Sequence, residues 1–271
     1  ENNFMPTAAE IAPHLKGAAL LALCSPLNPT GTMFTKKDLE EICDLVIAEN
    51  KTRAAGEKPL YLLYDQIYSQ LTFGRHEHFN PVSLRPELKD VTIFVDGASK
   101  CFAATGVRVG WGFGPAHVVN HMKAIVGHMG AWAPKAEQVA MAKYLKQDDL
   151  VNGYLNELKG NIQNSLNTLH QGFQQLKSEG FSVDSIEPMG AIYLTIKIDY
   201  IGKTTADGDV LKTSADINFY LIKAAGVAFV PFSAFGTDDD TPWFRVSVGA
   251  STLEDVQQIL PRIKNALVKL K

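Results

Sequence analysis

The sequence predicts an α/β protein with a mostly parallel sheet in its first half and a smaller α+β domain in its second half. In the first half, short apolar runs alternate with helical patterns, which is typical of strands joined by crossover helices. From about residue 147, one long helical pattern is followed by strand-like runs in close succession. With 46% hydrophobic residues, the 271-residue chain can form a core in each part. We therefore predict two domains, residues 1–146 and 147–271.

The composition excludes several classes of protein. The formal net charge is −3 and the basic residues are scattered, so we predict no nucleic-acid partner and no binding to an anionic membrane. The longest apolar run, AALLALC at 18–24, is too short to span a bilayer. Cys24, Cys43 and Cys101 lack metal-ligand spacing, and their odd number is not typical of a secreted disulfide framework. We therefore predict a cytoplasmic protein without a metal site.

Four apolar runs in the first domain are predicted strands, at residues 18–24, 59–65, 91–96 and 107–114. The first strand is followed by the turn SPLNPTGT and then by a helix at 36–50, whose apolar residues recur at helical spacing. Thr35 stands directly before this helix and can cap its N-terminus. The fourth run follows the third after a short loop, so we expect it to return antiparallel to the third.

The second domain begins with one long helix, predicted over residues 147–179. The remaining pattern predicts strands at 181–188, 190–199, 227–232 and 243–249, and helices at 214–226 and 252–270. Pro261 lies inside the last helix, where we expect its ring to produce a kink. This order of elements is that of a small α+β domain.

Three of the predicted strands end next to a polar or charged side chain. The first is followed by Asn28, the second ends in Asp65 with Tyr68 three residues on, and Lys100 follows the third. Ligands of open α/β sheets bind beyond the carboxyl ends of the strands, so Asn28, Asp65 and Lys100 are expected to converge there. Each alone is more often a turn residue, a helix cap or a surface group. Together they predict a site, because a lysine among small residues is costly to bury without a partner.

Five segments resemble, in order, the motifs of one protein family: SPLNPTGT, YDQIYSQLTFG, SKCFAATGVRVGW, EPMGAIYL and FRVSVGA. They are similar to motifs of the fold-type I, pyridoxal-phosphate-dependent aminotransferases of class I/II, the aspartate aminotransferase-like group. The likeness covers essentially the whole chain, and SK-x-F-x-x-x-G-x-R-x-G is a specific pattern. The resemblance implies that residues 1–146 are the C-terminal part of a pyridoxal-phosphate-transferase-like large domain, followed by the small C-terminal domain.

The resemblance assigns a cofactor, pyridoxal 5′-phosphate, and implies that Lys100 forms a Schiff base with it. Asp65 would be the acidic partner that keeps the pyridine nitrogen protonated, so that the cofactor can act as an electron sink. Asn28 and Tyr68 would hydrogen-bond the ring oxygen of the cofactor. The amine of Lys100 would then carry a proton between the substrate α-carbon and the cofactor.

The remaining contacts implied by the resemblance concern the phosphate and the substrate. Arg108 and Ser99 would bind the cofactor phosphate, for which the planar guanidinium fork is well suited. Arg245, in FRVSVGA, would bind the α-carboxylate of the substrate together with Asn28. The implied reaction moves an amino group between an α-amino acid and a 2-oxo acid, and the implied assembly is a homodimer.

Three features depart from the family pattern. Gly97 stands three residues before Lys100, where family members usually carry a serine whose hydroxyl contacts the phosphate. Phe232 follows a proline where the family usually has glycine, which is expected to reshape the substrate entrance. Family members are also longer, and nothing before Asn28 supplies their phosphate-binding loop or the aromatic residue that stacks on the ring. We therefore expect the C-terminal part of a longer protein, which holds only part of the pocket and binds the cofactor poorly by itself.

The motifs leave other functions open. The same scaffold carries β-lyases, decarboxylases and synthases, which these segments do not separate from aminotransferases. A different alternative is the aminotransferase-like effector domain of a transcription regulator, in which a basic winged-helix segment precedes this domain.

Overall fold

The structure, a computed structural model, describes residues 2–271. The chain divides into two units; the first contains residues up to 27, 32–158 and 189–191, and the second contains 28–31, 159–188 and 192–271. One boundary lies inside the long helix α7 (Asp148–Ser178), which forms as a single helix close to the predicted range. The short turn at 28–31 belongs to the second unit although it follows the first strand of the first unit.

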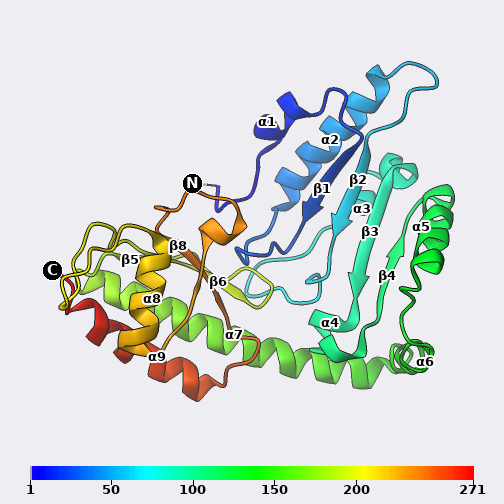
Figure 1. Cartoon of the computed structure of the whole chain (residues 1–271). Coiled ribbons are helices and arrows are strands. Elements are labelled where there is room, and N and C mark those ends of the chain that lie inside the picture. The colour runs from blue at the N-terminus through cyan, green and yellow to red at the C-terminus, as the bar shows by residue number, and fades with distance from the viewer. Residues whose placement is uncertain (1) are drawn as a thin grey trace. The chain divides into compact units, whose positions relative to one another are not determined.

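The sheet of the first unit contains four strands in the order β1 (Leu20–Cys24), β2 (Tyr61–Asp65), β3 (Thr92–Gly97) and β4 (Gly110–Phe113) (Figure 1). β1, β2 and β3 are parallel, whereas β4 is antiparallel to β3. The mostly parallel sheet and its antiparallel return are therefore confirmed. Because β2 and β3 point the same way, the loops that leave them emerge at the same edge of the sheet.

Helix α2 (Lys36–Thr52) forms the core of the first unit with one face of this sheet. Thr35 caps it, because its side chain accepts a hydrogen bond from Asp38 N while the Asp38 carboxylate accepts one from Thr35 N. Ile42 of the helix and Tyr64 of β2 are both fully buried in the same cluster. The predicted cap at Thr35 is therefore confirmed.

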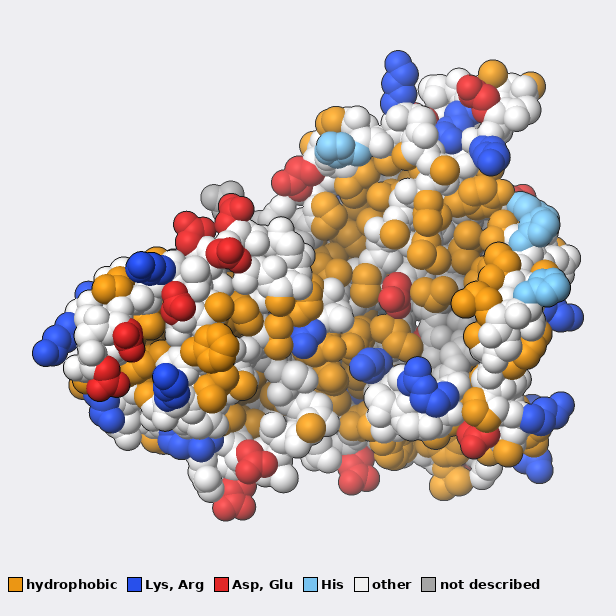
Figure 2. Space-filling view, in the orientation of Figure 1, with side chains coloured by type: hydrophobic (Ala, Val, Ile, Leu, Met, Phe, Trp, Pro, Cys, Tyr) orange, Lys and Arg blue, Asp and Glu red, His pale blue; other side chains and the backbone are white. Residues whose placement is uncertain are grey.

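The rest of the first unit is more exposed. It contains three short helices, α1 (Ala8–Ile11), α3 (Pro81–Leu84) and α4 (Ala98–Cys101). Two longer helices, α5 (Ala116–Met129) and α6 (Lys135–Tyr144), follow β4. None of the described residues of α5 and α6 is buried, and hydrophobic side chains gather on the face that Figure 2 shows over the first sheet. Within residues 2–271, no helix combines the length and apolar character that a membrane crossing requires.

The second unit contains an antiparallel sheet in the order β5 (Val183–Ser185), β6 (Tyr193–Ile198), β8 (Trp243–Ser247) and β7 (Val230–Pro231). Its helices are the C-terminal part of α7, α8 (Ser214–Ala225) and α9 (Leu253–Leu267), and α9 continues past Pro261 to its end. In the pairing of β6 with β8, Arg245 lies opposite Thr195. Thr195 Oγ1 also donates to the carbonyl of Thr30 at 2.7 Å, which joins the turn at 28–31 to this sheet.

Candidate functional site

Lys100 lies in α4, directly beyond the end of β3. Its side chain is half-buried, and its Nζ is 6.0 Å from the centroid of the Tyr68 ring. Tyr68 is only 2% exposed, so packing holds its ring in position. An ammonium over an aromatic face is attracted by the ring quadrupole. The structure thus brings together two of the residues that the sequence singled out.

Asp65 is the last residue of β2, the strand beside β3, and is half-buried. Its Oδ1 accepts a hydrogen bond from Ile67 N at 3.0 Å, which fixes the turn that leads to Tyr68. In the register of the two parallel strands, Asp65 lies opposite Val95. The carboxylate of Asp65 and the turn that carries Lys100 therefore lie at the same edge of the sheet.

Asp96, the penultimate residue of β3, is a charged neighbour that the sequence analysis missed. Its Oδ1 accepts a hydrogen bond from Gly97 N at 2.7 Å, and its Oδ2 accepts one from Gln66 Nε2 at 3.3 Å. Burial raises the pKa of Asp96 above its ordinary value, and the charge of Asp65 adds to this against the opposing effect of the two hydrogen bonds. The sequence feature that could have identified Asp96 is its acidic side chain four positions before Lys100.

Ser99 and Arg108 come from the same loop region as Lys100. Ser99 precedes Lys100 in α4 and is half-buried. Arg108 is exposed, has a left-handed backbone with φ of 56°, and donates from Nη1 to the carbonyl of Thr105 at 2.9 Å. A guanidinium carries five N–H donors. This hydrogen bond therefore orients the arginine and leaves further donors for an anion.

A side chain at Gly97 would be tightly packed against the backbone of β4. An added Cβ would lie 3.0 Å from Gly110 Cα and 3.1 Å from the carbonyl oxygen of Val109, both backbone atoms. Gly97 and Gly110 are directly paired in β3 and β4, so neither can move away without disturbing the sheet. The serine that the family usually has here would therefore crowd the backbone of β4. Ser99 remains as the hydroxyl in this turn.

Arg245 and Asn28 form a pair in the second unit. Arg245 Nη1 donates a hydrogen bond to Asn28 Oδ1 at 2.9 Å. The guanidinium carbon lies 4.7 Å from the centroid of the Tyr193 ring and 5.0 Å from that of Phe235. Arg245 Nε is buried and makes no hydrogen bond with any described residue. A buried donor without an acceptor is costly, so this arrangement favours an anionic ligand such as a carboxylate.

Phe232 packs against Phe235, one of the two rings beside Arg245. It is 2% exposed, and its ring packs edge-on against Phe235 with centroids 6.2 Å apart. Sequence reasoning missed Phe235 and Tyr193, because only their tertiary position beside Arg245 distinguishes them from core aromatic residues.

The residues that the sequence grouped fall into two sets. The first unit holds Asp65, Tyr68, Ser99, Lys100 and Arg108, and the second unit holds Asn28 and Arg245. The turn that carries Asn28 follows β1 and belongs to the second unit, where Asn28 contacts Arg245.

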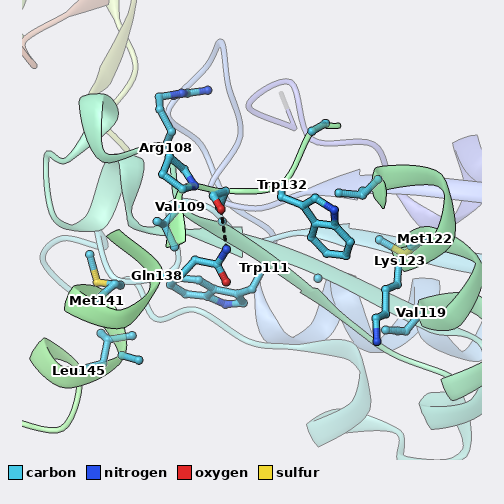
Figure 3. Close-up of a pocket in the computed structure, with 17 residues that line it drawn as sticks. Arg108, Val109, Trp111, Val119, Met122, Lys123, Trp132, Gln138, Met141 and Leu145 are labelled. Atoms are coloured by element: carbon cyan, nitrogen blue, oxygen red, sulfur yellow. Dashed lines mark hydrogen bonds between the residues drawn. The ribbon is translucent and has the colours of Figure 1, made fainter. Parts of the chain in front are cut away.

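A separate groove of about 850 Å³ lies between β4, α5 and α6 (Figure 3). Its walls include Trp111 from β4 and Trp132 from the loop between the two helices. Gln138 Nε2 donates to the carbonyl of Ala133 at 2.6 Å across the start of α6. Arg108 stands at the rim, and its side chain points away from both tryptophans (Figure 3). The groove is mainly apolar, and its lining contains Arg108 but neither Asp65 nor Lys100.

Comparison with known proteins identifies relatives along more than 90% of the chain. The family model for aminotransferases of class I and II matches residues 1–263. A bifunctional aspartate aminotransferase and glutamate/aspartate-prephenate aminotransferase from Petunia hybrida is 33% identical over 253 residues, which are 93% of this chain and 49% of the relative. An aspartate aminotransferase from Rhizobium meliloti is 29% identical over 251 residues, which are 92% of this chain and 56% of the relative.

Solved structures share the fold. The crystal structure of an aspartate aminotransferase from Rhizobium meliloti matches with a TM-score of 0.86 and 26% identity, over 100% of this chain and 63% of that one. An aromatic aminotransferase from Pyrococcus horikoshii matches with a TM-score of 0.83 and 26% identity, over 98% of this chain and 64% of that one. The chain spans about half of the Petunia relative's length. The predicted fold class, an α/β part followed by a smaller α+β part, is confirmed.

Proposed function

The chain belongs to the class I and II aminotransferase family, and on that premise we propose that it acts as a pyridoxal-phosphate-dependent aminotransferase. The reaction would move an amino group between an α-amino acid and a 2-oxo acid. The observation that carries the proposal is the placement of Lys100, half-buried over the ring of Tyr68 at the sheet edge where β2 ends in Asp65.

The residues present fit the chemical groups of this cofactor. Lys100 offers an amine for its aldehyde, and Asp65 offers a carboxylate for its ring nitrogen. Arg108 and Ser99 offer a guanidinium and a hydroxyl for its phosphate. Arg245 offers a half-buried guanidinium, oriented by Asn28, for the carboxylate of an amino acid.

The chain's own residues would then handle the proton and the charges. Pyridoxal phosphate, when bound, supplies an electron sink for the electron pair left at the substrate α-carbon. Lys100 Nζ would accept the α-proton as a general base and donate a proton back as a general acid. Asp65, as an anion, favours a proton on a neighbouring ring nitrogen. Tyr68 restricts the motion of Lys100, because its buried ring attracts the ammonium.

The substrate would be recognised by its carboxylate at Arg245. One donor of the guanidinium is occupied by Asn28, and the rings of Tyr193 and Phe235 flank the group. This arrangement fixes the plane of the guanidinium, and the side chain as a whole is only half-buried, so that a further N–H donor could face an incoming carboxylate. The class of substrate that follows is an α-amino acid.

We also propose that the protein is cytoplasmic, as its cysteine content indicates, and that it is a homodimer, as the family resemblance implies. Light scattering of the purified protein should report two chains per particle, and a monomer with full activity would contradict the proposal.

Covalent trapping tests the function directly. The protein is mixed with limiting pyridoxal phosphate, reduced with borohydride and digested, and the cofactor-bearing peptide is identified. We expect the label on Lys100, its loss in Lys100→Arg, and its retention in Lys89→Arg, which changes an exposed lysine of the same unit. Label mainly on another lysine would refute the assignment.

The products of a single turnover separate the alternatives. An aminotransferase converts an added amino acid into its 2-oxo acid and keeps the nitrogen on the enzyme. Release of ammonia would instead favour a β-lyase, and release of carbon dioxide would favour a decarboxylase. A protein that binds the cofactor but converts no amino acid would favour the effector-binding domain of a regulator.

A further inference from the structure

We propose that Asp96 is a positioning residue that fixes the turn carrying Lys100 relative to Asp65. The inference rests on the proposed function, in which Lys100 and Asp65 act on one cofactor. Asp96 itself would touch neither substrate nor cofactor, and it acts through two neighbours, Gly97 and Gln66.

The first contact holds the turn of Lys100. Asp96 Oδ1 accepts a 2.7 Å hydrogen bond from the N–H of Gly97, the residue at the start of α4. Lys100 is the third residue of that four-residue helix, so its backbone position follows from the orientation of Gly97. A short hydrogen bond to a carboxylate is among the stronger ones in proteins.

The second contact reaches the neighbouring strand. Asp96 Oδ2 accepts a hydrogen bond at 3.3 Å from the side-chain amide of Gln66, the residue after Asp65. The backbone N–H of Gln66 in turn donates to the carbonyl of Val95 at 3.0 Å. One carboxylate thus connects the turn after β2 with the turn after β3, and we call this arrangement the Gln66–Asp96 bridge.

A third constraint prevents the turn from shifting toward β4. The N–H of Ala98 donates to the carbonyl of Val109 at 3.0 Å, and Gly97 lies directly against Gly110. The contacts with β4 and the Gln66–Asp96 bridge together hold the start of α4 in one position. Without the bridge, only the contacts with β4 would hold it.

In this proposal, the side chain of Asp96 acts through its hydrogen-bond acceptors and not through its charge. Asp96 is half-buried near Asp65, where a second negative charge is unfavourable. An asparagine could still accept from Gly97 N–H, and the Gln66 amide could rotate to pair with its NH₂ group. Asp96→Asn should therefore preserve the bridge, whereas Asp96→Leu has a similar size and removes both hydrogen bonds.

The test measures the reactivity of Lys100 itself and needs no cofactor. The whole chain is treated with trace acetic anhydride at fixed pH, and acetylation of Lys100 is divided by that of Lys89, an exposed lysine in the same unit. The variants are Asp96→Leu, Gln66→Leu, the double variant and Asp96→Asn. Gln70→Leu, at an exposed glutamine outside the bridge, is the matched control.

We expect both leucine variants to change the Lys100 to Lys89 ratio by at least about twofold, and the double variant to change it no further, because the two side chains act as one unit. Asp96→Asn and Gln70→Leu should give the wild-type ratio. Unchanged ratios in the leucine variants, or equal changes in Asp96→Asn and Asp96→Leu, would overturn the proposal. If Asp96→Leu does not fold, Gln66→Leu against Gln70→Leu gives the same decision.

This readout is separate from the proposed function. If the ratios change as expected but the cofactor is not trapped at Lys100, the role of the Gln66–Asp96 bridge is supported and the proposed function is contradicted. If the cofactor is trapped at Lys100 but the ratios do not change, the proposed function is supported and the role of the bridge is contradicted.

Discussion

Arg245 donates a hydrogen bond of 2.9 Å from Nη1 to Oδ1 of Asn28, although the two residues are 217 positions apart in the sequence. The bond joins the middle of β8 to the turn that follows β1, within one structural unit. Because the adjacent Nε is buried and has no acceptor among the described residues, the guanidinium is oriented without being fully satisfied. The proposed contact of Arg245 with a substrate carboxylate rests on this geometry.

The first prediction follows from this pair. Arg245→Lys keeps the positive charge but loses the planar fork, so it cannot bond Asn28 and a carboxylate in the same geometry. Loss of one charge-assisted hydrogen bond, about 1.5–3 kcal/mol, should raise KM for the amino acid about 10- to 100-fold with a smaller change in kcat. Steady-state kinetics measure this, with the exposed Arg262→Lys as control. Equal KM values in both variants would contradict the role.

The second prediction concerns Gly97. Gly97→Ser would restore the residue that the family usually has, but its Cβ would contact the backbone at Gly110 and Val109. Gly97 has an extended backbone with φ of 177°, so the penalty is one of space and not of conformation. We expect a loss of about 1–3 kcal/mol in the free energy of unfolding, typical of overpacking.

Thermal or urea unfolding measures this loss. Gly106→Ser is the matched control, because nothing lies within 4 Å of a Cβ at that position. If Gly97→Ser unfolds at the same point as Gly106→Ser, the close approach of β3 and β4 does not exclude a side chain there.

The sequence predicted the parts of the fold that depend on local patterns. Strands β2 and β3 and helix α2 follow from apolar runs, helical spacing and the cap at Thr35. The two strands point the same way, so the sequence also placed Asp65 and Lys100 at one edge of the sheet.

The features it missed depend on tertiary pairing. The crowding at Gly97 depends on its register with Gly110, and the proposed role of Asp96 depends on Gln66, which follows the neighbouring strand β2. The assignment of Asn28 to the second unit depends on contacts with residues more than 160 positions away, such as the hydrogen bond between Thr30 and Thr195, which are 165 positions apart. A single sequence shows none of these long-range relationships.

The third prediction concerns Asp65. Asp65→Asn should leave the fold intact, because the amide oxygen can still accept the hydrogen bond from Ile67 N. Loss of the anion next to the cofactor ring nitrogen should slow transamination by about 100-fold or more, about 2.7 kcal/mol in the activation free energy. Single-turnover rates measure this against Asp90→Asn, an exposed carboxylate of the same unit. Near-normal turnover by Asp65→Asn would remove the residue from the proposed mechanism.

The last prediction concerns the pH dependence of stability. His78 lies beside the buried Tyr64, with ring centroids 5.8 Å apart, and burial lowers the pKa of His78 to about 4 from an ordinary value near 6.5. Because the folded pKa lies below the unfolded one, the unfolded chain binds the proton first as the pH falls. The contribution of His78 to the free energy of unfolding should therefore be complete above about pH 6.5. It should decrease by about 3 kcal/mol between pH 6.5 and 4 and change no further below pH 4.

Urea unfolding across this range should show a smaller decrease for His78→Phe than for the wild type. His128→Phe, at an exposed histidine, should show the same decrease as the wild type. Identical pH profiles for His78→Phe and the wild type would mean that another group causes the loss of stability.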